Sequence, residues 1–138
     1  SPYWTWPATA ALFAAVMWLS AAPLQQASLE EAEAQPLTAT QTRFAEAEGY
    51  ETVHDTILGR CSMCHAREPS WEGIRVPPKG VVLETTADIA REARQIYLQA
   101  GVTDAMPPAN LTFIEPEERA AIVAWYRGAA DGAQSAAN

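Results

Sequence analysis

The sequence has few basic residues, few cysteines and few histidines, and each shortage excludes a class of protein. Nine lysines and arginines stand against 17 aspartates and glutamates, which gives a net charge of −8. A nucleic-acid-binding protein needs a basic face to neutralise phosphates, so we expect no nucleic-acid partner. Two cysteines are too few for a disulfide-rich secreted scaffold. Together with two histidines, they fill at most one small metal site.

Charge is also missing from one end of the chain. Residues 1–29 contain no charged side chain, and most of residues 1–24 are apolar. This length is close to the roughly 20 apolar residues that span a bilayer. Tyr3, Trp4 and Trp6 gather at one end, as aromatic residues do at a membrane interface. We therefore expect a transmembrane helix over residues 1–24, with a signal-like remnant or a buried helix as the alternatives.

The remaining residues suffice for one domain with extensions. A chain of 138 residues that begins with Ser1 is expected to be a processed protein or a piece of a longer one. Residues 25–48 are rich in alanine, glutamate, glutamine and threonine and predict an acidic linker. Residues 49–128 form the predicted domain, and residues 129–138 a disordered tail.

One motif is chemically specific. Cys61, Ser62, Met63, Cys64 and His65 form a C-x-x-C-H sequence, the attachment signature of c-type haem. Two thiols at this spacing reach the two vinyl groups on one edge of a porphyrin, and the adjacent histidine lies beneath the ring, where it can ligate iron. A thioredoxin-like redox pair would need a βαβ pattern, and a zinc site would need two further ligands. The sequence therefore predicts one covalent haem c.

Met106 is the candidate for the second axial ligand of that haem. Met17 lies in the apolar N-terminal segment, and Met63 lies inside the attachment turn itself. Met106 follows His65 by 41 residues (106 − 65) and is followed by two prolines that stiffen the chain. The alternative is a methionine that fills a gap in the core. Ligation by histidine and methionine fills both axial sites and favours electron transfer over substrate chemistry.

The other candidate residues carry weaker signals. Trp71 is a candidate for packing against the haem edge, although an ordinary packing role explains it equally well. His54 is expected to face solvent rather than to bind iron. Apolar residues recur at helical spacing before Cys61, between Thr85 and Gly101, and after Pro116, and no strand pattern stands out. We therefore expect an all-α domain that uses the haem as much of its core.

These motifs carry a family resemblance. C-S-M-C-H, the downstream Met-Pro-Pro and a last helix ending in Ala-Trp-Tyr resemble a small class I cytochrome c over about 80 C-terminal residues. A narrower set of residues is similar to the cytochrome c domain of the membrane-bound cytochrome c urate oxidases (urate hydroxylases). These residues are Arg60–Ala66, Pro69, Trp71–Ile74, Pro78–Val81, Ile96–Tyr97 and Ala105–Thr112.

The resemblance implies a cofactor, a location and an activity. It implies haem attachment at Cys61 and Cys64, with His65 and Met106 as axial ligands. It also implies that a membrane domain, whose last helix would be residues 1–24 and most of which is absent from these 138 residues, oxidises urate and passes electrons through this haem to the respiratory chain. The chain itself would then be an electron carrier of a larger oxidoreductase. The implied location is the bacterial inner membrane, with the haem domain on the periplasmic side.

Two other functions remain open at this point. One is a free-standing membrane-anchored cytochrome c that serves a respiratory complex, and the other is a haem-based sensor. For any electron carrier of this kind, the acidic surface predicts redox partner proteins with a basic docking face. Such association should weaken as salt concentration rises.

Overall fold

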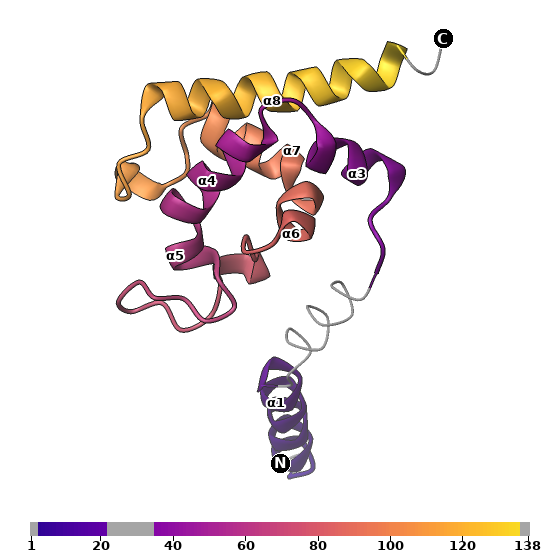
Figure 1. Cartoon of the computed structure of the whole chain (residues 1–138). Helices are drawn as coiled ribbons and strands as arrows, with labels where there is room; N and C mark the ends of the chain where they lie inside the picture. The colour runs from indigo at the N-terminus through magenta and orange to yellow at the C-terminus, as the bar shows by residue number, and fades with distance from the viewer. Residues whose placement is uncertain (1–2, 22–34, 136–138) are drawn as a thin grey trace. The chain divides into compact units, whose positions relative to one another are not determined.

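The computed structural model describes residues 3–21 and 35–135, which fall into two units. Each unit is described by itself. None of the described residues forms a β-strand, so both units are helical wherever they have regular structure (Figure 1). The second unit is a small all-α domain and contains every candidate haem residue.

The first unit corrects the prediction of a transmembrane helix over residues 1–24. Its helix, α1 (Thr5–Ala21), has 17 residues, of which six are alanines. At about 1.5 Å per residue, this length falls short of a hydrocarbon core of about 30 Å. Across residues 3–21 and 35–135, no helix is both long enough and apolar enough to cross a membrane. The prediction is wrong because it took an alanine-rich, uncharged composition as sufficient for a span, whereas α1 is too short for one.

Short helices joined by loops make up the second unit, apart from one long helix at its C-terminal end (Figure 1). These elements are α3 (Ala39–Glu46), α4 (Tyr50–Arg60), α5 (Ser62–His65), η1 (Pro78–Gly80), α6 (Thr86–Arg91), α7 (Ala93–Ile96), η2 (Tyr97–Val102), η3 (Pro108–Asn110) and α8 (Pro116–Ser135).

The core of this unit lies where α8 crosses the other helices. Helix α8 contacts α3, α4, α7 and η2. Val53 and Ile57 on α4 and Ile122 on α8 are fully buried, and Trp125 is nearly so. These residues recur at three- or four-residue intervals along their helices, so each helix presents one apolar stripe to the other. The C-terminal end of α4, where the C-x-x-C-H motif begins, is therefore anchored by buried side chains.

The compact unit includes residues on both sides of the domain predicted at 49–128. Helix α3 lies within the segment assigned to a linker and begins with a capping box, in which the Thr38 side chain accepts from the Gln41 backbone. Phe44 on α3 is buried, and its carbonyl accepts a hydrogen bond of 2.9 Å from Trp125 Nε1. At the other end, α8 continues to Ser135, within the segment assigned to a disordered tail.

Gly101 allows η2 to approach α8 closely. A Cβ atom at this position would lie 3.0 Å from Val123 Cγ2, a tight contact that the valine would have to relieve by shifting slightly. The expected helix between Thr85 and Gly101 is present as three consecutive elements, α6, α7 and η2. It begins at a capping box formed by Thr85 and Asp88. Its last turn is thereby placed against α8, next to the loop that carries Met106.

Candidate haem-attachment site

The two cysteines and His65 lie on one continuous turn at the end of α4. The Cys61 backbone N–H donates to Ile57 O at 2.9 Å, and the His65 N–H donates to Cys61 O at 3.0 Å. Because Ile57 is fully buried, the turn begins from a fixed point of the core. Cys61 and Cys64 are free thiols, and both are half-buried, as is His65. The site therefore presents two thiols and one imidazole, all partly accessible, from five consecutive residues.

A backbone segment that crosses α5 orients the His65 ring. The Nδ1 atom of His65 lies 2.9 Å from Val81 O, and the His65 carbonyl accepts from Leu83 N–H at 2.7 Å. The Ser62 hydroxyl also donates to Leu83 O. Because a carbonyl only accepts, Nδ1 carries the proton and Nε2 is left as the metal-binding nitrogen. This arrangement is typical of a ligating histidine whose second ring nitrogen is held by the protein.

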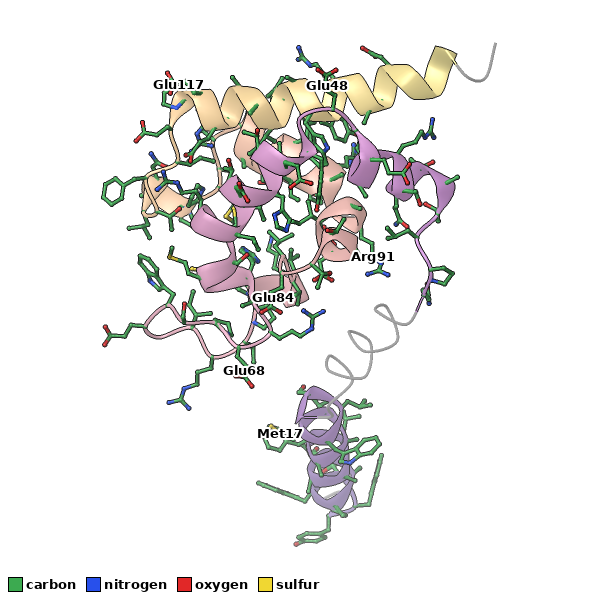
Figure 2. The ribbon with its side chains drawn as sticks, in the orientation of Figure 1. Met17, Glu48, Glu68, Glu84, Arg91 and Glu117 are labelled. Atoms are coloured by element: carbon green, nitrogen blue, oxygen red, sulfur yellow. The ribbon has the colours of Figure 1, made fainter. Side chains whose placement is uncertain are left out.

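The loop after His65 folds back onto the attachment turn. The backbone N–H groups of Ser70 and Trp71 both donate to Met63 O at 3.0 Å, and the Trp71 side chain is half-buried. Figure 2 shows Glu68 pointing away from the helices on this loop, whereas Glu84 lies beside α6. Trp71 is thus held beside the motif, and its packing against a haem remains a prediction.

Met106 is held against the same core as the attachment turn. Cys61, Val81 and Met106 are partly buried, and all three pack on the buried cluster formed by the helices. The Met106 N–H donates to Gln99 O at 2.9 Å, and its carbonyl accepts from Arg119 Nη1 at 2.9 Å. The backbone of this residue is therefore fixed on both sides while its thioether stays partly accessible.

Arg60 ties the attachment turn to the loop that contains Met106. Its Nε atom lies 3.2 Å from both carboxylate oxygens of Glu118, and its Nη1 donates to Thr112 O at 3.1 Å. Arg60 precedes Cys61, and Thr112 follows Met106 by six residues, so one side chain links the start of the motif to the segment that follows Met106. Sequence reasoning missed this role of Arg60. The signal available was only its place beside Cys61.

The thiol environment is unlike that of a redox-active pair. Burial raises the pKa of the Cys61 thiol to about 11, and burial also raises the pKa of the Cys64 thiol. A thioredoxin-like pair needs a lowered pKa because the thiolate is the nucleophile. Within the described residues there is also no strand from which a βαβ unit could be built. The turn therefore lacks both the lowered thiol pKa and the strands that a thioredoxin-like pair needs.

The zinc alternative finds no support in the arrangement of ligands. In the described ranges, no group of three or more His, Cys, Asp or Glu side chains is placed to hold a metal ion. His54 lies on α4, half-buried, with its Nδ1 3.6 Å from Asp55 Oδ1 and its ring 5.7 Å from the Tyr50 ring. It was expected to face solvent, and it is engaged by its own helix instead.

Comparison with known proteins does not assign the chain to a family. No family model, no curated protein and no solved structure matches it. The function therefore has to be argued from the motif and from the contacts that position His65 and Met106.

Proposed function

We propose that the compact unit is a c-type cytochrome domain that holds one haem through Cys61 and Cys64 and carries single electrons. His65 and Met106 would be the axial ligands. The observation that carries the proposal is the hydrogen bond from His65 Nδ1 to Val81 O, which leaves Nε2 for iron within a C-x-x-C-H motif. A bound haem would supply a one-electron ferric–ferrous couple.

The two thiols suit covalent attachment. Each thiol would add its S–H bond across one vinyl group, which forms one C–S bond and one C–H bond and needs no oxidant. Burial raises the pKa of both thiols, which is the opposite of the lowered pKa that a reactive redox cysteine needs. Their place at the end of α4 gives both a fixed backbone from which to react.

His65 and Met106 suit electron transfer rather than substrate chemistry. When both axial positions are occupied by side chains, no open position is left for oxygen or a substrate. Support for the role of Met106 comes from its backbone, whose N–H and carbonyl are both held by neighbouring elements. The domain would then act as a carrier, with its acidic surface selecting partners that present a basic face.

We further propose that the electrons come from a urate-oxidising membrane domain of a larger protein. The support is the similarity of the residues around the motif and around Met106 to the cytochrome c domain of the urate oxidases. The test uses membranes that contain the full-length protein, in which added urate should reduce the haem and added allantoin should not. A free-standing respiratory cytochrome c would show no reduction by urate.

Covalent attachment is tested by producing the chain in a bacterium that carries a c-type cytochrome maturation system. The native protein should keep its haem through denaturing electrophoresis, and a pyridine haemochrome assay should give one haem per chain. The Cys61→Ser/Cys64→Ser variant should lose the haem, whereas Ser70→Ala, an exposed change nearby, should keep it. A native chain without covalent haem would refute the proposal.

Ligation by Met106 is tested in the same protein by carbon monoxide. With both axial positions occupied, the spectrum of the reduced native protein should not respond to the gas. Met106→Ala should open one position and make the spectrum respond. A native spectrum that already changes with carbon monoxide would favour the haem-based sensor instead.

A further inference from the structure

We propose that Arg119 on α8 is the positioning residue that holds Met106 at the iron. This inference rests on the proposed function, because it concerns the strength of a haem ligand. It comes from a set of contacts that the haem motif does not explain, all made by one guanidinium group with the segment around Met106.

The Arg119 guanidinium is nearly enclosed and makes several contacts. Its side chain is only 14% exposed, and its Nη1 donates to Met106 O at 2.9 Å and to Ala100 O at 2.5 Å. The same nitrogen lies 3.2 Å from Asp104 Oδ1, and Nη2 lies 3.5 Å from Asn110 Oδ1. The Arg119 side chain thus contacts Ala100 on η2, Met106 itself, and one residue on each side of Met106, namely Asp104 and Asn110.

These contacts complete the anchoring of the Met106 backbone. The N–H of Met106 is bonded to Gln99 O on η2, and its carbonyl is bonded to Arg119 on α8. Without Arg119, only the N–H group of Met106 would be held, and Met106 could rotate about its hydrogen bond to Gln99 on η2. The thioether would then spend less time in a position that can bind a metal.

The loop also needs an external support because its backbone is strained. Four residues that are not glycine have left-handed conformations here, namely Asp104, Ala109, Asn110 and Phe113, with φ between 50° and 55°. Asp and Asn adopt this conformation readily, whereas Ala109 and Phe113 need surrounding contacts to hold it. Asn110 supplies part of that support by bonding its side chain to Ile114, and Arg119 contacts Asp104 and Asn110 in the same loop.

The chemistry of arginine is required for this role. A guanidinium is a planar group with five donors and reaches several acceptors at once, whereas a lysine ammonium is a point charge on a flexible stem. Arg119→Lys keeps the positive charge beside Asp104. Its side chain is one bond shorter than the reach to Nη1, which donates to the carbonyls of Ala100 and Met106, and it has no second nitrogen to contact Asn110. This substitution therefore separates positioning from simple charge.

The test compares haem-loaded Arg119→Lys and Arg119→Gln with Arg127→Gln. Arg127 lies on the same helix, is exposed, and contacts Tyr97 instead of the Met106 segment. The first readout is the sulfur-to-iron charge-transfer absorption of the oxidised protein, and the second is the affinity for imidazole, which competes with the thioether. We expect both Arg119 variants to lose part of the absorption and to bind imidazole at least about tenfold more tightly, from the loss of buried hydrogen bonds. Arg127→Gln should behave like the native protein.

Each result decides the question. Native-like absorption and imidazole affinity in both Arg119 variants would overturn the role of Arg119 and leave the haem proposal standing. A native protein without haem, or without the sulfur-to-iron absorption, would instead refute the haem proposal or the ligation by Met106. If the variants fail to fold, NMR of the reduced native protein provides the test. The Arg119 guanidinium protons should exchange slowly there, and exchange as rapid as that of Arg127 would overturn the proposal.

Discussion

Phe44 offers a direct measure of whether α3 belongs to the folded domain. The sequence assigns this residue to an acidic linker, where replacing it with alanine should leave stability unchanged. In the structure Phe44 is only 8% exposed, stacks on Tyr126 with ring centres 5.1 Å apart, and lies edge-on to Trp125 at 5.7 Å. We expect Phe44→Ala to lower the free energy of unfolding markedly.

The size of the effect follows from the burial of the ring. Replacing a core phenylalanine by alanine costs about 3–5 kcal/mol, through lost transfer free energy and the cavity left behind. Phe44 lies at the edge of the core and keeps a small exposed area, so about 3 kcal/mol is the appropriate figure. The hydrogen bond from Trp125 Nε1 goes to the Phe44 carbonyl and survives the substitution, so it adds nothing to the loss.

The assay is urea unfolding of the haem-loaded chain, followed by far-ultraviolet circular dichroism. With a urea dependence of roughly 1–3 kcal/mol per molar for a small protein, the midpoint should fall by roughly 1–3 M. Phe113→Ala is the matched control, because Phe113 is 72% exposed and its replacement should change stability by less than about 0.5 kcal/mol. If Phe44→Ala unfolds at the same urea concentration as Phe113→Ala, then α3 does not pack on α8 and the reasoning fails.

Two further predictions concern the surroundings of His65. Ser62→Ala removes the hydroxyl that donates to Leu83 O, so it should lower the free energy of unfolding by about 1 kcal/mol in the same urea assay, whereas Ser70→Ala should not. Burial raises the pKa of Glu92 above its ordinary value of 4.5, and the nearby His65 offsets part of this rise. Because the folded state favours the protonated carboxyl, the free energy of unfolding falls as Glu92 ionises with increasing pH. Glu92→Gln should therefore stabilise the protein at pH 7, by less than about 1 kcal/mol for a half-exposed group, and should have no effect near pH 3, with Glu68→Gln as the control. Equal urea midpoints for native protein and Glu92→Gln at both pH values would contradict this reasoning.

The sequence predicted well those features that depend on local chemistry. The helical segments expected after Thr85 and after Pro116 begin at those residues, because the backbone groups at a helix start are satisfied within one turn. The apolar stripe before Cys61 is similarly local, and Val53 and Ile57 from it are buried. Leu58 is 40% exposed, because it lies one position round the helix from Ile57 and faces away from the core.

The sequence predicted poorly those features that depend on distant partners. Helix α3 is mostly polar, and its single large apolar residue is buried only because Trp125, 81 residues further along, provides a surface for it. Nothing within residues 25–48 indicates that partner. The prediction of a transmembrane helix was wrong for a different reason. It was based on apolar composition, but α1 does not reach the length that a membrane span needs.

The contacts that position the candidate ligands share one property that explains why they escaped prediction. Three of them end on backbone carbonyls, at Val81 for the His65 ring, at Met106 for Arg119 and at Thr112 for Arg60. A carbonyl is present whatever side chain the residue carries, so the identity of the acceptor residue leaves no trace in the sequence. It follows that Val81→Ala should preserve the hydrogen bond to His65, whereas replacing Arg60 or Arg119 removes the donor and its hydrogen bonds. The sequence therefore indicates which side chains provide the chemistry of the site. Their geometry depends on the backbone conformation of neighbouring loops, which the sequence does not indicate.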